Sequence, residues 1–219
     1  MKCSSIDTIF LDLDGTLLDL AYDNYFWHDH IPNLIAKKNK LPFEKVKIEF
    51  ENIYKSKQNT IEWYSLDYWS KIFEIDLKNE VLKTKNKIKI FPNAHNLLTN
   101  LKKRKIRIIL LTNCPRDMLD IKLTQTQLWG FFDKVISSED YGFSKEDDRF
   151  WHNLNTAIDF NKMNTLFVDD SENVLNCASR NGIKNIFYIK FPDSNKEGQI
   201  IKNFNPLDSI DLIVNIIID

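Results

Sequence analysis

Short apolar runs alternate with amphipathic segments along most of the chain. The apolar runs have the composition of buried strands and occupy residues 9–11, 106–111, 134–137, 165–168 and 185–189. The segments between the later runs carry apolar residues on one face and predict helices at 91–104, 115–127, 144–158, 171–181 and 207–218. Strands that alternate with helices are typical of a doubly wound, Rossmann-like α/β fold with a parallel sheet.

The segment between residues 20 and 85 has a different pattern. It is rich in aromatic and charged residues and contains no glycine. We expect helices at 23–39, interrupted or kinked by Pro32, at 43–57, and at 60–73, the last largely buried. The sequence therefore predicts a small all-helical cap over 19–85, inserted into a core made of 1–18 and 86–219.

Charge and composition exclude several kinds of partner. The 30 basic and 31 acidic side chains nearly cancel, which argues against binding a nucleic-acid polymer through its phosphates. No stretch is apolar enough to span a bilayer, and the first residues lack an apolar signal core. The three widely spaced cysteines form neither a metal-binding pattern nor a disulfide framework. We expect a cytoplasmic protein without a membrane partner.

Two aspartates directly follow the first apolar run. Asp12 and Asp14 occupy alternate positions, so both can reach the same small volume, and Gly15 then lets the backbone turn. An Asp-x-Asp-Gly sequence is by itself often a solvated turn. The buried-type strand that leads into the pair, and the polar residues that follow later strands, favour a functional site instead.

Polar residues also follow the later strands. Because the carboxyl ends of parallel strands meet in one crevice, we expect these side chains to gather beside the aspartate pair. They are Thr112, Asn113, Lys145, Asp169 and Asp170. Each is weak evidence alone, but together they supply carboxylates, a hydroxyl, an amide and an ammonium at one edge of the sheet.

This set suits phosphoryl transfer through an aspartyl-phosphate. Asp12 would be the nucleophile, and Asp14 would protonate the leaving oxygen and then take a proton from water. Thr112, Asn113 and Lys145 would bind the phosphate, with Lys145 also pairing with Asp12.

A metal ion is expected at the same edge. Carboxylate oxygens suit Mg²⁺, and Asp169 and Asp170 would anchor it. Asp12 and the main-chain carbonyl of Asp14 would complete the set of metal ligands.

These residues resemble the four motifs of the haloacid dehalogenase-like hydrolase superfamily. They are Asp12-x-Asp14-Gly15-Thr16, Leu111-Thr112-Asn113, Lys145, and Val168-Asp169-Asp170. The second acid, Asp14, favours a phosphatase over a dehalogenase because a leaving alkoxide needs a proton and a leaving halide does not. The helical insertion resembles the small cap of that superfamily.

A finer resemblance is to the bacterial GMP/IMP 5′-nucleotidase family. It rests on residues 17–27, on 63–70 in the cap, and on 142–147, where Ser144 replaces an expected proline. The resemblance implies hydrolysis of purine nucleoside monophosphates. Asn24, Tyr64 and Tyr68 are candidate contacts to the base. For any single aromatic a place in the core of the cap is favoured over stacking on a base, and Asn24 could equally make a contact at a helix N-terminus.

Two other functions stay open from the sequence. A phosphatase or phosphomutase for a sugar phosphate or another small phosphate would share every core residue and differ in the cap. A catalytically silent scaffold would keep the fold, but it has no need for four close carboxylates. The protein is expected to act as a monomer or homodimer on a small phosphate monoester.

Overall fold

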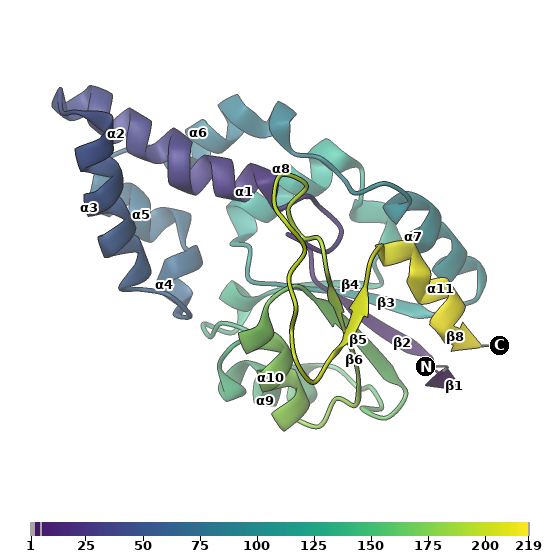
Figure 1. The fold of residues 1–219 in the computed structure, drawn as a ribbon. Helices are drawn as coiled ribbons and strands as arrows, with labels where there is room; N and C mark the ends of the chain where they lie inside the picture. Colours follow the sequence, from purple (N-terminus) through teal and green to yellow (C-terminus); the bar gives the residue numbers. More distant parts are fainter. Residues whose placement is uncertain (1–2, 5, 219) are drawn as a thin grey trace.

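A computed structural model describes residues 3–4 and 6–218 of the chain. Its centre is a six-stranded parallel sheet with the strand order β4-β3-β2-β5-β6-β7 (Figure 1). The strands are β2 (Thr8–Leu11), β3 (Arg107–Thr112), β4 (Lys134–Ser137), β5 (Thr165–Asp169), β6 (Asn185–Ile189) and β7 (Asn205–Leu207). The predicted α/β class with a parallel sheet is confirmed.

The register of the sheet brings three strand ends together. Leu11, the last residue of β2, lies opposite Leu110 of β3 and Val168 of β5. The strand order reverses at β2: β3 and then β4 extend the sheet from one edge of β2, and β5, β6 and β7 extend it from the other edge. Crevices that bind ligands form at such reversal points, at the carboxyl ends of the strands. The residue after Leu11 is Asp12.

Helices cover both faces of the sheet, as Figure 1 shows. Successive strand residues point to opposite faces, so Ile9 and Leu11 belong to one apolar cluster and Phe10 to the other. The first cluster packs under α7 (Ala94–Lys103), α8 (Arg116–Thr126) and the short α11 (Ile213–Ile216). The second packs under α9 (Asp148–Ala157) and α10 (Glu172–Arg180). The near-continuous apolar strands thus follow from burial on both sides.

The residues between β2 and α7 form a separate group of helices at the carboxyl end of the sheet (Figure 1). They are α1 (Ala21–Tyr25), α2 (Ile31–Asn39), α3 (Phe43–Lys55), α4 (Ile61–Tyr64), α5 (Leu66–Phe73) and α6 (Leu77–Thr84). An inserted all-helical segment is therefore present, while the exact division into 19–85 and the core stays a prediction. We call these helices the cap.

Pro32 does not break the first cap helix. Helical structure runs from α1 through a π-helical turn at Phe26–His30 into α2, where Pro32 lies in the first turn. Proline is tolerated there because the wider π-helical turn directly before it changes the hydrogen-bonding pattern at the point where the proline N–H is missing.

The predicted helix over 60–73 is two helices. The chain is extended at Ser65, whose side chain accepts a hydrogen bond from the main-chain N–H of Tyr68 and so begins α5. The following helix α6 was not predicted from the sequence; Asp76 caps it through the N–H of Asn79.

The predicted closing helix over 207–218 is wrong for most of its length. Leu207 ends β7, and only Ile213–Ile216 is α-helical. The last described residues, β8 (Ile217–Ile218), pair in parallel with β1 (Cys3–Ser4) in a separate two-stranded sheet. The β-branched residues at this end favour extended structure over helix, and pairing with β1 stabilises the extended form of β8.

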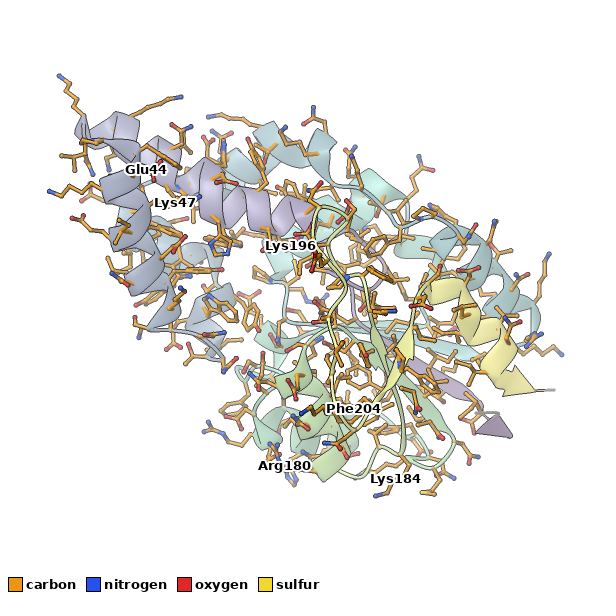
Figure 2. All side chains as sticks on the ribbon, in the orientation of Figure 1. Glu44, Lys47, Arg180, Lys184, Lys196 and Phe204 are labelled. Atoms are coloured by element: carbon orange, nitrogen blue, oxygen red, sulfur yellow. The ribbon has the colours of Figure 1, made fainter. Side chains whose placement is uncertain are left out.

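Charged side chains of both signs lie over the surface of cap and core (Figure 2). Several form exposed pairs, for example Lys47 with Asp29 at 2.9 Å, which contribute little to stability. Among the described residues, no helix is both long enough and apolar enough to cross a membrane.

Candidate active site

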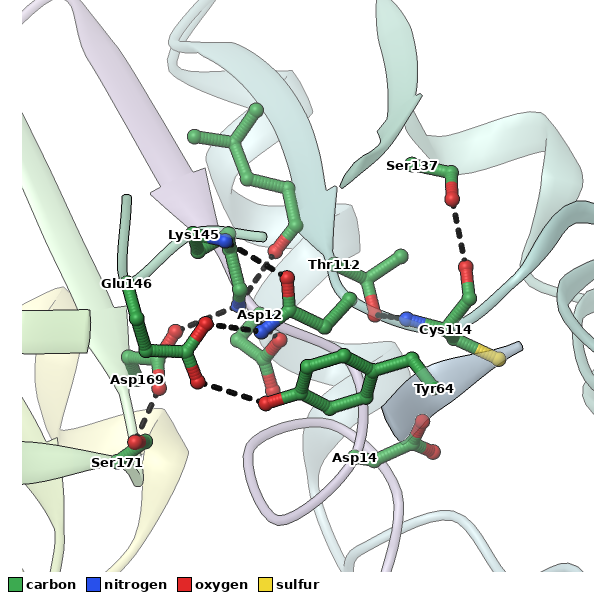
Figure 3. A network of polar contacts seen from close by, with 12 residues as sticks. Asp12, Asp14, Tyr64, Thr112, Cys114, Ser137, Lys145, Glu146, Asp169 and Ser171 are labelled. Atoms are coloured by element: carbon green, nitrogen blue, oxygen red, sulfur yellow. Dashed lines mark hydrogen bonds and ion pairs between the residues drawn. The ribbon is translucent and has the colours of Figure 1, made fainter. Parts of the chain in front are cut away.

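Asp12 and Lys145 form a buried ion pair at the end of β2. The Lys145 ammonium donates to Asp12 Oδ1 at 2.5 Å, to Asp169 Oδ2 at 2.7 Å and to the main-chain oxygen of Leu111 at 3.0 Å (Figure 3). Its three protons therefore have three acceptors, which is what a buried ammonium requires. Lys145 lies in the turn before α9 and brings the only cation into contact with Asp12 among the described residues.

Burial changes the proton affinity of both partners. For Asp12, burial is the largest effect and raises the pKa; Lys145 lowers it, the Asp169 and Asp14 carboxylates raise it, and the net result is a pKa of about 8. Burial lowers the pKa of Lys145, but Asp12 and Asp169 outweigh that effect and raise it overall. Lys145 is therefore charged at neutral pH. A further cation beside Asp12 would favour its carboxylate form, in which it can act as a nucleophile.

Three carboxylates gather at this position. One oxygen each from Asp12, Asp169 and Asp170 lies within 4.8 Å of the others. Burial raises the pKa of Asp170 well above its usual value, and Asp169 and Asp12 raise it further. Three acidic groups that share one ammonium leave negative charge uncompensated, and their oxygen atoms are the ligands that Mg²⁺ prefers. The residues present thus fit a magnesium ion.

Gly15 allows this cluster to form. Its backbone has a φ of +86°, and a Cβ at this position would lie 2.5 Å from Asp170 Oδ2. Any other residue would be strained there and would push against the acidic cluster. The glycine that the sequence predicted for a turn is therefore needed for space as well.

Asp14 lies beside a different lysine. Its Oδ1 is 2.7 Å from the Nζ atom of Lys122, on α8, and its carboxylate is not part of the three-carboxylate group. Its predicted contribution to the metal, through the main-chain carbonyl, stays a prediction.

Lys122 was missed in the sequence, although a signal was present. It lies four residues after Met118, so the two side chains share one face of the helix, and both are buried. Leu119 and Leu123 of the same helix are buried as well, and Ile121 packs partly buried against the same apolar cluster. A lysine on the apolar face of a helix indicates a buried partner, and here the partners are Asp14 and Asp23 of the cap.

Thr112 and Asn113 hold the loops around the site. Thr112 Oγ1 accepts a hydrogen bond from the N–H of Cys114 at 3.0 Å. Asn113 Oδ1 accepts from the N–H of Lys145 at 2.9 Å, and its Nδ2 donates to Glu146 Oε2 at 3.0 Å. The predicted role of both residues in binding phosphate stays a prediction, because their side chains already have these structural partners.

Glu146 is a further residue that the predicted site did not include. Besides Asn113, it accepts a hydrogen bond from the hydroxyl of Tyr64 of the cap at 2.6 Å (Figure 3). Tyr64 and Glu146 lie far apart in the sequence, so no local pattern could have paired them. The contact joins the cap to the turn that carries the buried lysine.

A cavity of about 380 Å³ lies between cap and core. Its core side is lined by the three clustered carboxylates, by Asp14, and by Thr112, Asn113 and Lys145. Its cap side is lined by Asp23, Asn24, Trp27, His28, Tyr54, Trp63 and Tyr64. Volumes of this order suit small-molecule ligands. The cavity opens directly onto Asp12.

The three predicted base contacts have different positions. Asn24 and Tyr64 line the cavity, and Asn24 also donates to Asp193 Oδ2 at 2.6 Å. Tyr68 does not line it; it borders a separate hollow of about 130 Å³. Because the chain turns at Ser65, Tyr68 lies on α5, a helix apart from Tyr64. The structure therefore gives no support to Tyr68 as a contact to substrate in this cavity.

The fold and the site together define a class of protein. The chain belongs to the haloacid dehalogenase-like hydrolases, because the model of that family matches residues 9–188. Two relatives, both the GMP/IMP nucleotidase YrfG, come from Escherichia coli (strain K12) and Shigella flexneri. Each is 36% identical over 189 residues, which cover 86% of this chain and 85% of the relative. The family and these relatives identify a hydrolase of the phosphatase type.

Solved structures agree on the fold. A HAD phosphatase from Thermococcus onnurineus superposes with a TM-score of 0.78 at 17% identity, covering 99% of this chain and 97% of that one. The magnesium-bound putative HAD-hydrolase YfnB from Bacillus subtilis superposes with a TM-score of 0.73 at 18% identity, covering 96% and 98%. The resemblance inferred from the sequence motifs is thus confirmed at the level of family and fold.

Proposed function

We propose that this protein is a magnesium-dependent 5′-nucleotidase that hydrolyses GMP and IMP through an aspartyl-phosphate on Asp12. One observation carries the proposal: Asp12 lies at the floor of the cavity in contact with Lys145, while the second acid, Asp14, lines the same cavity. A nucleophile and a separate proton donor are the two groups that this reaction needs.

In the first step, a carboxylate oxygen of Asp12 attacks phosphorus and the bond to the 5′-oxygen of the nucleoside breaks. Asp14 gives its proton to that oxygen, so the nucleoside leaves as an alcohol. Lys145 stabilises the negative charge that collects on the phosphate and on Asp12.

In the second step, water attacks the phosphorus of the acyl phosphate and the bond to Asp12 breaks. Asp14, now a carboxylate, takes the proton of the water. Inorganic phosphate leaves, and both aspartates return to their starting protonation states. Closure of the cap over the cavity would keep bulk water from competing for the intermediate.

Magnesium would be held by Asp12, Asp169 and Asp170. When bound, it neutralises charge on the phosphate oxygens and on the nucleophile, which otherwise repel each other. The raised pKa values of Asp12 and Asp170 support this assignment, because burial and the neighbouring carboxylates disfavour their charged forms, which a bound cation would stabilise. The magnesium-bound state of YfnB also supports it.

The substrate class rests on the cap and on the relatives. The names of the two 36% identical relatives specify GMP and IMP. Aromatic residues on the cap side of the cavity offer faces on which a purine can stack, among them Trp27, which stacks on Tyr54 with ring centroids 5.2 Å apart. The phosphate would then lie at Asp12 and the base against the cap.

A cytoplasmic location and a monomeric or homodimeric state belong to the same proposal. Cys114 and Cys177 are buried free thiols, as expected in a reducing compartment. Fractionation of the cells and the mass of the protein in solution test these two points.

The function is tested by phosphate release from nucleoside monophosphates and sugar phosphates, with magnesium and after its removal. We expect GMP and IMP to be hydrolysed fastest, and only with the metal. Asp12→Asn is the matched control for contaminating phosphatases. A sugar phosphate in first place would retain the mechanism and refute the nucleotide assignment. No release from any ester would refute the phosphatase and favour the scaffold.

A further inference from the structure

Lys122 is fully buried, with 0% of its surface exposed, and it touches two cavity-lining carboxylates. Its Nζ atom lies 2.7 Å from Asp14 Oδ1 and 2.7 Å from Asp23 Oδ1. The three residues come from three places: Asp14 from the loop after β2, Asp23 from cap helix α1, and Lys122 from α8. One ammonium thus joins the proposed proton donor to the cap.

Packing alone does not account for this lysine. Its neighbours on the inner face of α8 are Met118, Leu119 and Leu123, so an apolar side chain would suit the position. A buried ammonium is stable only when carboxylates or other acceptors surround it. The ring of Tyr22, 5.7 Å from Nζ, adds to the stabilisation. The ammonium charge of Lys122 is therefore best explained by its contacts with Asp14 and Asp23.

The two contacts differ in kind. Lys122 donates a hydrogen bond to Asp23 Oδ1, whereas its contact with Asp14 is an ion pair without hydrogen-bond geometry. Asp14 Oδ1 is buried and has no hydrogen bond to any described residue. Asp14 is consequently held in place by charge, and its side chain, 18% exposed, lines the cavity.

Each of the two proposed catalytic aspartates thus forms an ion pair with a different lysine. Lys145 contacts Asp12 and Asp169, and Lys122 contacts Asp14 and the cap. We propose that Lys122 is a positioning residue, which sets the Asp14 carboxyl group for proton transfer to the leaving oxygen once Asp23 of the cap completes the cluster. This inference rests on the proposed phosphatase function and names a residue that acts through Asp14.

The dependence on the leaving group tests it. An alkyl ester such as GMP needs a proton on the departing oxygen, whereas p-nitrophenyl phosphate releases a stable anion that needs none. We expect Lys122→Met to lower kcat/KM for GMP about 100-fold or more, and that for p-nitrophenyl phosphate by less than about 5-fold. A merely structural role would lower both by the same factor.

A double-mutant cycle tests whether Lys122 acts through Asp14. In an Asp14→Asn background, Lys122→Met should change kcat/KM for GMP by less than about 3-fold, because the group that it positions is absent. If the losses of the two single variants multiply in the double variant, the two residues act independently and the proposal is wrong. Lys78→Met is the matched control, since Lys78 joins the cap to Asp117 of the same helix at 2.9 Å without touching Asp14. It should leave both esters unaffected.

A second variant addresses folding. Lys122→Met leaves two carboxylates without their cation, whereas Lys122→Met combined with Asp23→Asn keeps the net charge of the cluster. If the single variant does not fold, the double variant should still show the loss for GMP over p-nitrophenyl phosphate. Equal losses on both esters refute the role of Lys122 alone. A wild-type protein that hydrolyses neither ester refutes the proposed function itself.

Discussion

Tyr64 of the cap donates a hydrogen bond to Glu146, the residue that follows Lys145, at 2.6 Å. The second oxygen of Glu146 accepts from Asn113, which in turn accepts from the main-chain N–H of Lys145. A cap side chain is therefore connected to the turn that carries the catalytic lysine through one carboxylate and one amide. The position of the cap and the position of Lys145 are coupled.

Tyr64→Phe removes this connection and keeps the ring. A hydrogen bond to a charged group contributes about 1.5–3 kcal/mol, so we expect kcat/KM for GMP to fall about 10-fold or more as the cap loses its contact with the core. Steady-state kinetics measure the change. Tyr68→Phe is the control, because Tyr68 lies outside the cavity. Equal effects of the two variants would contradict the coupling.

Magnesium affinity should depend on pH. Without metal, burial raises the pKa of Asp12 to about 8, so at neutral pH a proton must leave before the metal binds. The affinity should therefore rise by up to about tenfold per pH unit between pH 6 and 8 and level off above. Calorimetric titration in buffers of different ionisation enthalpy measures both the affinity and the released proton. An affinity that is constant over this range would contradict the prediction.

The stability of the metal-free protein should fall as pH rises. Burial and the Asp14 carboxylate raise the pKa of Asp23 and Lys122 lowers it, with a net pKa of about 7. The folded state therefore binds this proton more tightly than the unfolded chain does. The resulting stabilisation is present below about pH 4 and is lost between about pH 4 and 7.

Asp23→Asn isolates that contribution. The variant should show a shallower decrease of the melting temperature over the same range than the wild type, because the titrating group is gone. Asp117→Asn, which alters an exposed ion pair on the same side of the molecule, should keep the wild-type slope. Identical slopes for wild type and Asp23→Asn would contradict the raised pKa.

The core of the site was predictable because the carboxyl ends of neighbouring parallel strands lie at the same edge of the sheet. Apolar runs fixed the strands, and parallel pairing then required Asp12 and Asp169 to lie at one edge, where Lys145 reaches both. The chemistry of the residue types pointed to phosphoryl transfer. This part of the prediction needed only local patterns and one general rule of sheet topology.

The remainder depends on contacts that no local pattern contains. Lys122 meets Asp14 and Asp23 only after α8 and the cap have packed, and Glu146 meets Tyr64 in the same way. The sequence predicted one continuous helix over 60–73, whereas the break at Ser65 places Tyr68 on a different helix from Tyr64. Where the local sequence did not decide between alternative structures, as at Ser65, tertiary packing did.

The most direct test of the account is whether phosphate is transferred to Asp12. The wild-type protein is mixed with magnesium and GMP that carries radioactive phosphorus, and the reaction is stopped rapidly with acid. Radioactive phosphate should then be found on Asp12, in an acyl phosphate that hydroxylamine cleaves. Asp12→Asn should fold, as judged by circular dichroism, carry no label, and lose turnover by about 10⁴-fold or more. Label on another residue, or substantial phosphate release by Asp12→Asn, would contradict Asp12 as the nucleophile.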